Sequence, residues 1–328
     1  MRIRLADYVA DFLVSHGVTD VFSVVGGGAM HLNDAFGHQE GLKITYNHHE
    51  QACTIAAEGY TRQTGKIAPV CVTGSPGGTN AITGVFGAYV DSIPMFVVTG
   101  QAKRETTVWS TNLPLRQLGD QEVNITSAVS TMTKYAKMIT DPMSIRKEVE
   151  KAWFLMLNGR PGPVWLDIPG DVASTFIETD DLEGFDKQGY IDEHWASFNQ
   201  DNPVYDEQYT KDVLAKIKEA KRPVILAGTA IRHAGQQSEF IKCIDKLGIP
   251  VVTAWDAHDI IWDEHPLYCG RPGTVGTRAG NFIVQNADLL IVLGCRMNIR
   301  MIGYNFGDFG KNAYKIVVDI DDAELNKP

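Results

Sequence analysis

The sequence predicts an α/β protein made of two doubly wound units, each with a parallel sheet. Short apolar runs alternate with amphipathic segments in both halves, and several of the runs end in glycine-rich turns. Strands of a parallel sheet read as continuous apolar runs because helices cover both faces of the sheet. The chain of 328 residues, 44% of them hydrophobic, is long enough to form two cores of ordinary size.

In the first half, apolar runs bounded by turn residues mark the expected strands. The runs are Val21–Val25, Lys43–His49, Ile67–Thr73, Met95–Gly100 and Val164–Ile168. Apolar residues at helical spacing predict helices between these strands. The predicted helices are Leu5–Leu13, Gln51–Tyr60, Ala81–Val90 and Ser144–Leu157. A long irregular stretch runs from Gln101 to about Ser130.

Residues 173–205 are rich in acidic side chains and contain few strand signals, so we expect an inter-domain linker there. This linker separates a first domain, residues 1–172, from a second domain, residues 206–328. In the second domain, apolar runs predict strands at 223–228, 250–253, 288–294 and 314–320. A helix is expected around Phe240–Leu247, which gives this half the same α/β alternation.

Composition excludes several classes of function. The formal net charge is -10 and no basic run occurs, so nucleic acid is not expected as a partner. No segment has the length and apolarity of a membrane span. The five cysteines show no metal-ligand spacing, which is typical of buried thiols in a reducing compartment. We therefore expect a cytoplasmic protein.

Glu50 has the most informative position in the sequence. It separates the strand-like run Lys43–His49 from the helix-like run Gln51–Tyr60. A carboxylate among small and apolar residues is costly unless something pairs with it. We therefore predict that Glu50 shares a proton with a bound cofactor.

A glycine-rich turn, Gly26–Gly28, follows the first of the expected strands and lets a ligand approach the backbone closely. One alternative is a dinucleotide fingerprint, as in an NAD-dependent dehydrogenase, with Glu50 holding the ribose. His31 stands where the third glycine of that fingerprint belongs. The other alternative is a tight turn without a ligand.

A second turn, Gly74–Asn80, lies between an expected strand and an expected helix. It lacks the Lys-Ser or Lys-Thr pair of a Walker loop, but it offers backbone N–H groups where α/β sheets usually bind ligands. With Gly26–Gly28 and Glu50, three strand ends then point at one crevice. His48 and His49 are not expected to bind one metal, since neighbouring strand residues point to opposite faces.

Several segments, in order along the chain, carry a family resemblance. They are Asn47–Ala52, Gly59–Gly65, Gly74–Asn80, Asp91–Met95, Thr99–Gln101 and Gly159–Val164. Together they resemble the acetolactate synthase branch of the thiamine diphosphate enzymes. The resemblance covers residues 3–170 as the pyrimidine-binding domain. It continues through residues 205–325 as the Rossmann-like central domain of that family.

The resemblance implies a catalytic role for Glu50. The family glutamate hydrogen-bonds the N1′ atom of the aminopyrimidine ring, which favours the tautomer that removes the C2 proton of the thiazolium. A carboxyl in a poorly solvated site suits this proton sharing, because burial raises its proton affinity. The resemblance also implies cofactor binding by residues of the two glycine-rich turns: Gly26, Gly27, Gly28, Thr73, Ser75, Pro76, Gly77 and Asn80.

The resemblance places Asp120, Gln121 and Lys134 at the substrate pocket and implies a 2-keto acid such as pyruvate as donor. Solvated surface positions are the alternative for Gln121 and Lys134. Asp120 stands where acetolactate synthases usually have phenylalanine, which makes the pocket polar and negative. The pattern Arg116–Glu122 is similar to that of synthase-like proteins linked to surface-sugar synthesis. A polar or sugar acceptor is therefore an alternative to the chemistry of branched-chain amino acid synthesis.

The family holds the diphosphate through magnesium bound to a Gly-Asp-Gly motif, which this sequence lacks. We therefore expect no metal ligand in this chain, no diphosphate-binding domain, and magnesium bound only through that domain. The chain alone is then expected to be inactive. It would be a fragment of a longer enzyme, part of a split enzyme with a separate diphosphate-binding chain, or a non-catalytic subunit. The resemblance also implies a homodimer or tetramer, and FAD in the central domain near Arg296 and Asp319.

Overall fold

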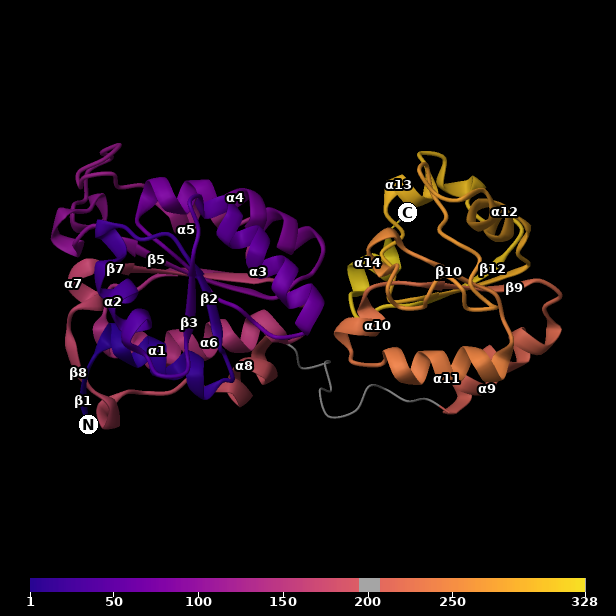
Figure 1. Cartoon of the computed structure of the whole chain (residues 1–328), viewed down its shortest axis with the longest axis horizontal. Coiled ribbons are helices and arrows are strands. Elements are labelled where there is room, and N and C mark those ends of the chain that lie inside the picture. The colour runs from indigo at the N-terminus through magenta and orange to yellow at the C-terminus, as the bar shows by residue number, and fades with distance from the viewer. Residues whose placement is uncertain (195–206, 328) are drawn as a thin grey trace. The chain divides into compact units, whose positions relative to one another are not determined.

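The computed structural model describes residues 1–194 and 207–327. The chain forms two compact units, Met1–Phe198 and Asn199–Pro328 (Figure 1). Each unit is built on a parallel sheet, as the sequence predicts.

The first unit contains a six-stranded parallel sheet with the strand order β3-β2-β4-β5-β7-β6. The strands of the unit are β1 (Arg2–Arg4), β2 (Asp20–Ser23), β3 (Lys43–Tyr46), β4 (Val70–Val72), β5 (Met95–Gln101), β6 (Tyr135–Met138), β7 (Pro163–Pro169) and β8 (Phe176–Glu178). The helices are α1 (Leu5–Ser15), α2 (Met30–His38), α3 (Glu50–Thr64), α4 (Ser75–Val90), α5 (Ile125–Val129), α6 (Ile145–Leu157), α7 (Gly170–Ala173) and α8 (Lys187–His194). A short 3-10 turn, η1, spans Gly27–Ala29.

The central strands β5 and β7 are buried along their whole length, which explains why they read as unbroken apolar runs. Their side chains alternate between two cores. Phe96 and Leu166 face the core formed with α1, α2 and α6, whereas Val97 and Trp165 face the core formed with α3, α4 and α5. Figure 1 shows these two groups of helices on opposite faces of the sheet.

The segment predicted to be a linker carries ordered structure in its first part. Strand β8 pairs antiparallel with β1, with Ile177 opposite Ile3. Ile177 and Leu182 are buried in the core on the α1 side. The buried side chains of Ile177 and Leu182 thus pack the first part of the predicted linker against the first unit. Residues 195–206 lie outside the described residues, and the predicted domain boundaries at 172 and 206 remain predictions.

Two further local differences concern the sheet edges. Strand β3 ends at Tyr46, and residues 48 and 49 form a bend rather than the end of the strand. Strand β6 was not predicted, because Tyr135–Met138 lies at the sheet edge and its residues are half-buried or exposed. An edge strand gives a weaker apolar signal than a strand covered on both faces.

The second unit contains a four-stranded parallel sheet with the order β10-β9-β11-β12. Its strands, β9 (Pro223–Ala227), β10 (Val251–Thr253), β11 (Leu289–Leu293) and β12 (Tyr314–Val318), confirm the strands predicted for this half. Its helices are α9 (Glu207–Glu219), α10 (Ala230–His233), α11 (Gln237–Leu247), α12 (Arg278–Asn286), α13 (Ile299–Ile302) and α14 (Asp322–Asn326). Ile225 and Ile291 pack with α11 on one face, and Leu226 and Leu290 pack with α12 on the other.

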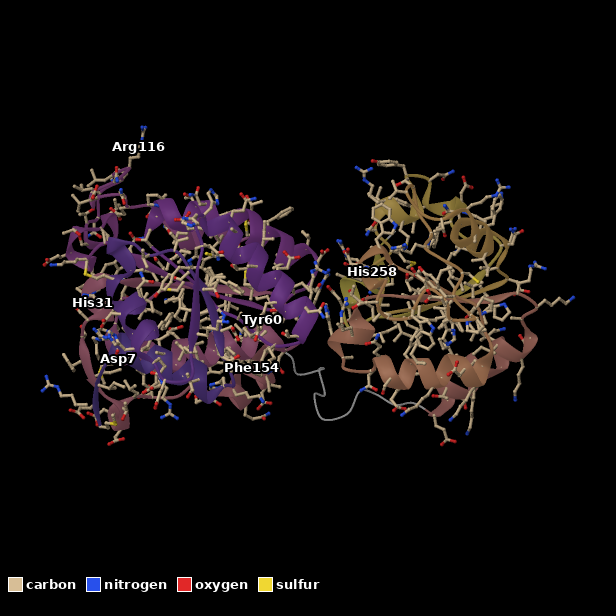
Figure 2. All side chains as sticks on the ribbon, viewed as in Figure 1. Asp7, His31, Tyr60, Arg116, Phe154 and His258 are labelled. Carbon is tan, nitrogen blue, oxygen red and sulfur yellow. The ribbon has the colours of Figure 1, made fainter. Side chains whose placement is uncertain are left out.

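Side chains fill the space between sheet and helices within each unit (Figure 2). Among the helices of the described residues, none combines the length and the apolarity that crossing a bilayer requires.

Candidate active site

The carboxyl ends of β2, β3 and β4 bring the predicted residues to one edge of the first sheet. Gly26–Gly28 follow β2, Glu50 follows β3, and Thr73–Ser75 follow β4. Parallel α/β sheets usually bind ligands at this edge, where loops carry the functional groups. The three turns that the sequence analysis expected to converge therefore lie on the same side of the sheet.

Glu50 is the first residue of α3 and is half-buried. The preceding residue, His49, caps this helix, because its Nδ1 accepts a hydrogen bond of 3.2 Å from the N–H of Gln51. The amide Nδ2 of Asn80 donates to Glu50 Oε2 at 3.0 Å. Within the described part of the chain, no hydrogen bond to the other oxygen, Oε1, is present. Asn80 thus fixes the carboxylate and leaves one oxygen for a ligand.

Gly77 packs closely beside Glu50. A Cβ atom at Gly77 would lie 3.1 Å from Glu50 Oε1 and 2.9 Å from Thr73 Cγ2. Any larger residue in this first turn of α4 would press on the carboxylate. Glycine is therefore required here by the close packing of α4 against Glu50.

Glycine is needed at positions 26 and 28 because the backbone and side chain of residues 73–74 pack closely against both. A Cβ atom at Gly26 would lie 2.4 Å from Thr73 Cβ, and one at Gly28 would lie 3.0 Å from the Gly74 nitrogen. The N–H of Gly28 also donates to Thr73 Oγ1 at 3.1 Å. In the dinucleotide alternative a pyrophosphate would lie beside these glycines, where Thr73 and Gly74 already pack.

Gly27, between them, differs in its surroundings. A Cβ atom at Gly27 would meet no atom within 4 Å, and the residue is exposed. This turn therefore presents open space at the middle glycine and close packing at the two flanking ones.

Ser75 ties a loop to the same edge. It is buried at the start of α4, and its Oγ accepts a hydrogen bond of 2.5 Å from the N–H of Val123. The next residue, Pro76, is exposed in the first turn of α4. Asp120 and Gln121, three and two residues before Val123, are exposed on the same loop. The structure thus places the predicted substrate residues Asp120 and Gln121 next to the α4 turn.

Lys134 lies elsewhere. Its backbone N–H donates to the carbonyl of Pro163, the first residue of β7, at 2.8 Å, so Lys134 stands at the amino end of the sheet. Its Nζ donates to the carbonyl of Asn158, which caps the carboxyl end of α6, and a cation is favourable there. Burial lowers the pKa of Lys134 to about 8. The structure does not bring this lysine to Glu50 within the chain.

Asp167 was missed by the sequence analysis. It is buried in β7, and burial raises its pKa to about 7, opposed by hydrogen bonds from Thr99 and Gln101. The Thr99 hydroxyl donates to Oδ1 at 2.7 Å and the Gln101 amide donates to Oδ2 at 3.0 Å. A carboxylate inside the unbroken apolar run Val164–Ile168 was the signal that pointed to a buried polar network.

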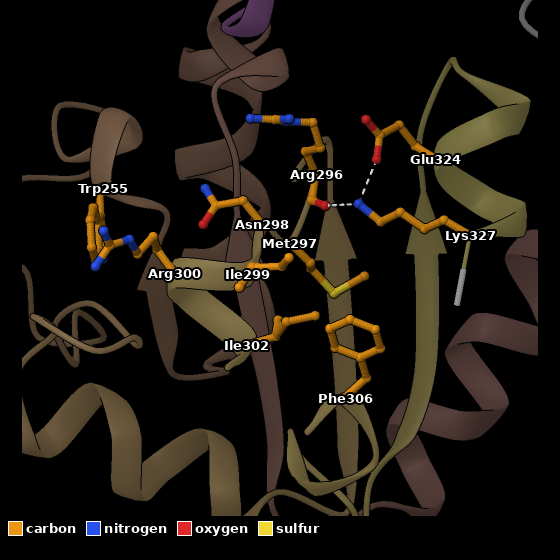
Figure 3. A pocket seen from close by; sticks show the side chains of 10 residues that line it. All are labelled: Trp255, Arg296, Met297, Asn298, Ile299, Arg300, Ile302, Phe306, Glu324 and Lys327. Atoms are coloured by element: carbon orange, nitrogen blue, oxygen red, sulfur yellow. Dashed lines mark hydrogen bonds and ion pairs between the residues drawn. The ribbon is translucent and has the colours of Figure 1, made fainter. Parts of the chain in front are cut away.

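The second unit has a cavity of about 650 Å³ at the carboxyl edge of its own sheet (Figure 3). Its lining combines apolar and cationic side chains: Trp255, Arg296, Met297, Asn298, Ile299, Arg300, Ile302, Phe306, Glu324 and Lys327. Lys327 donates to Glu324 and to the backbone carbonyl of Arg296. In the described residues, the guanidinium groups of Arg296 and Arg300 have no ion pair. The cavity therefore carries two cations free for an anionic ligand.

A metal ion finds no ready set of ligands in the described ranges 1–194 and 207–327. No group of three or more His, Cys, Asp and Glu side chains is placed there to hold one. His48 and His49 are both exposed, and His49 serves as the cap of α3.

Comparison with known families matches both units. The description "thiamine pyrophosphate enzyme, N-terminal TPP binding domain" matches residues 3–127, and "thiamine pyrophosphate enzyme, central domain" matches residues 210–328. The chain belongs to the thiamine pyrophosphate enzyme family. The first match covers the edge that carries Glu50, and the second covers the unit with the cavity.

Within that family, the chain is similar to acetolactate synthase large subunits. It is 34% identical over 311 residues to the acetolactate synthase large subunit of Lactococcus lactis, covering 95% of this chain and 51% of that protein. It is 32% identical over 329 residues to the acetolactate synthase isozyme 1 large subunit of Escherichia coli, covering 99% and 54%. The chain spans about half the length of the curated relatives it matches.

Proposed function

We propose that the first unit binds the aminopyrimidine end of thiamine diphosphate, with Glu50 as its proton partner. The observation that carries this proposal is the carboxylate itself: Asn80 donates to Oε2 at 3.0 Å, and Oε1, beside which only a glycine fits at position 77, accepts no hydrogen bond within the described residues. A fixed, half-buried carboxyl is suited to share a proton with a ring nitrogen. The open space at Gly27 is available to the bound ligand at the same edge.

The reaction we propose is decarboxylation of a 2-keto acid, with pyruvate as donor, followed by joining of the remaining fragment to a second carbonyl compound. When bound, thiamine diphosphate supplies the electron sink for the decarboxylation. The task of this chain is to hold a proton at Glu50 and to orient the substrates. The similarity to acetolactate synthases supports this lyase or transferase class.

The choice of the second substrate is proposed to lie with Asp120 and Gln121. Both are exposed on the loop that Ser75 ties to α4. A carboxylate and an amide at this place favour a polar acceptor, because they offer hydrogen-bonding groups rather than an apolar surface. A sugar-like carbonyl compound fits this chemistry as well as a second keto acid does.

Magnesium and the ligands of the diphosphate are proposed to come from residues outside those described here. The described residues offer no group of three or more metal-ligating side chains, so they do not fit a magnesium ion. A partner chain or a further segment of the same protein would supply the ion. We therefore propose that the isolated chain binds the cofactor weakly, with little dependence on magnesium.

An adenine nucleotide, of which FAD is one, is proposed as a second ligand, in the cavity of the second unit. The cavity of about 650 Å³ is large enough for a nucleotide, and Arg296 and Arg300 offer charge for its phosphates. Trp255 and Phe306 supply apolar lining for a ring system. Asp319, predicted to lie near this ligand, follows β12 at the same edge of the sheet.

A homodimer or tetramer in the cytoplasm is proposed as the working state. Large apolar side chains are exposed on the neighbouring helices α3 and α4: Ile55 is 51% exposed, Phe86 53% and Tyr89 40%. Exposed apolar groups that gather on one surface are typical of protein interfaces. Sedimentation of the chain with and without the substitution Phe86→Glu measures the association.

Titration with thiamine diphosphate tests the central proposal. The Glu50→Gln variant keeps the shape of the side chain but cannot hold the proton as a carboxylate does. We expect it to lose activity by roughly 100-fold or more when the chain is assayed together with the proposed diphosphate-binding partner, since general acid–base groups contribute at that level. Cofactor binding by the isolated chain is expected to weaken in the same variant.

The control is Glu40→Gln, an exposed glutamate of the same unit. Equal cofactor affinity and equal activity for Glu50→Gln and Glu40→Gln would contradict the proposal. Binding of NADH, in place of thiamine diphosphate, would support the dehydrogenase alternative instead.

A further inference from the structure

The loop between β5 and α5 holds one residue in an unusual backbone conformation. Gln121 has φ of 56°, in the left-handed region that residues other than glycine rarely adopt. Gln121 and Asp120 are exposed, so their own side chains are not packed into the core. Other residues of the loop must therefore hold this conformation.

Glu122 is the residue that does so. Its Oε2 accepts hydrogen bonds from the backbone N–H groups of Leu118, at 3.0 Å, and Gly119, at 2.9 Å. Its Oε1 accepts a third, of 2.6 Å, from the N–H of Val108. Hydrogen bonds to an ionised carboxylate are stronger than those between neutral groups. One side chain thus joins two segments of the loop that are ten residues apart in sequence.

The residue before the exposed pair is also fixed. Gly119 is buried, and a Cβ atom there would lie 2.6 Å from the carbonyl oxygen of Thr106 and 2.9 Å from Ala102 Cβ. The backbone at Gly119 is therefore pressed against the start of the same loop. Asp120 and Gln121 project from between this packed glycine and Glu122.

The residue after Glu122 is anchored to the sheet. The carbonyl of Val123 accepts a hydrogen bond of 3.2 Å from Gln101 Nε2, and the N–H of Val123 donates to Ser75 Oγ. Gln101 Nε2 also donates to the buried carboxyl of Asp167 at 3.0 Å. The exposed pair is therefore attached to the same α4 turn that borders Glu50.

We infer that Glu122 is a positioning residue that presents Asp120 and Gln121 to the carbonyl substrates, in a loop that Gln101 and Asp167 anchor to the sheet through Val123. The inference rests on the proposed function. The inference goes beyond the proposed function because it assigns an effect on substrate affinity to Glu122, whose carboxylate binds backbone N–H groups of its own loop. Glu122 then governs the affinity for the carbonyl substrate that meets this loop, with pyruvate as the probe because it can also serve as the second keto acid, and leaves the affinity for the cofactor unchanged.

Amide hydrogen exchange tests the loop directly, without any assay of activity. In Glu122→Ala, the amides of Val108, Leu118 and Gly119 are expected to lose at least about tenfold in protection, because their acceptor is removed. Glu122→Gln keeps one acceptor oxygen, so these amides are expected to retain part of their protection. The matched control is Glu105→Ala, an exposed glutamate of the same loop, which should change none of the three amides. Unchanged protection in Glu122→Ala overturns the inference.

Ligand affinity tests the assigned role. The intact chain is loaded with thiamine diphosphate and titrated with pyruvate, with both dissociation constants measured for wild type, Glu122→Ala, Glu122→Gln and Glu105→Ala. We expect at least a roughly tenfold weaker affinity for pyruvate in Glu122→Ala, partial rescue in Glu122→Gln, and cofactor affinity within about twofold throughout.

The outcomes separate the two proposals. If the wild type binds the cofactor and Glu122→Ala keeps its affinity for pyruvate, the role of Glu122 is refuted and the proposed function stands. If cofactor and pyruvate affinities fall together, Glu122 is a general structural residue and the inference is refuted. If the wild type does not bind thiamine diphosphate, the proposed function fails and the substrate role of Glu122 fails with it.

Discussion

The two units use the same edge of a parallel sheet in opposite ways. In the first unit the edge is largely packed by its own chain, and the group it offers is an acid, Glu50, held by Asn80. In the second unit the edge opens into a cavity of about 650 Å³ with the cations Arg296 and Arg300. The shared architecture decides where a ligand binds, whereas the side chains at the strand ends decide its charge.

Both edges nevertheless depend on a glycine at a close crossing of the backbone. A Cβ atom at Gly100 would lie 2.0 Å from the carbonyl oxygen of Gly28, and one at Gly228 would lie 2.0 Å from that of Gly294. Neither contact can be relieved by a side-chain rotation, because the opposing atoms belong to the backbone. We therefore expect the substitution of Gly100 and that of Gly228 to destabilise their units to a similar extent.

Substitution of these glycines has the largest expected effect on stability. Gly100→Ala and Gly228→Ala should each lower the free energy of unfolding by roughly 3 kcal/mol or more, each in its own unit. Thermal unfolding followed by calorimetry measures this. The controls are Gly59→Ala and Gly307→Ala, where a Cβ atom meets nothing within 4 Å. A mild effect at Gly100 with a severe one at Gly228 would break the parallel between the units.

The buried acid gives the first unit a pH dependence. Because the folded pKa of Asp167, about 7, is raised above the ordinary value of 3.8, its contribution to stability is complete below pH 3.8 and is lost as pH rises through 7. We expect the first unit to be more stable at pH 5 than at pH 7.5 by about 2 kcal/mol from this group. Asp167→Asn should remove that difference in chemical unfolding experiments. A difference that persists in this variant would assign the effect to other groups.

The cationic cavity predicts a smaller effect, on binding. Arg300→Gln removes one of its unpaired cations and should weaken the affinity for ADP or FAD about tenfold, or about 1.4 kcal/mol. The free energy of unfolding should stay the same, because Arg300 has no ion pair among the described residues. Calorimetric titration measures the affinity, with Arg278→Gln, an exposed arginine outside the cavity, as control. Equal losses in the two variants would show that the cavity is not the binding site.

Among the glycine substitutions at the first edge, only a small change in stability is expected at Gly27. Gly27→Ala adds a methyl group where no atom lies within 4 Å, so the free energy of unfolding should change by less than about 0.5 kcal/mol. If a ligand occupies that open space, the affinity for thiamine diphosphate falls in this variant. Gly26→Ala, by contrast, is expected to destabilise the unit, since its Cβ atom would lie 2.4 Å from Thr73 Cβ. The pair separates a glycine required by the fold from one proposed to lie beside the ligand.

The sequence by itself determined the elements and the residues at their ends. Apolar runs and helical spacing depend on neighbours along the chain, so they indicated the central strands and placed Glu50 at a strand-to-helix junction. The ordered motifs also identified the family, which the matches to both units confirm. Strand β6 was not predicted from the sequence, because an edge strand carries a weaker apolar signal.

Only the tertiary structure decided which residues meet. It packed Gly26 against Thr73, joined Glu122 to Val108, and placed Lys134 at the far end of the sheet from Glu50. These contacts follow from the strand order β3-β2-β4-β5-β7-β6, which brings together segments far apart in sequence. Local patterns carry no information on that order, because the burial of a strand between two layers of helices is the same whichever neighbours it has.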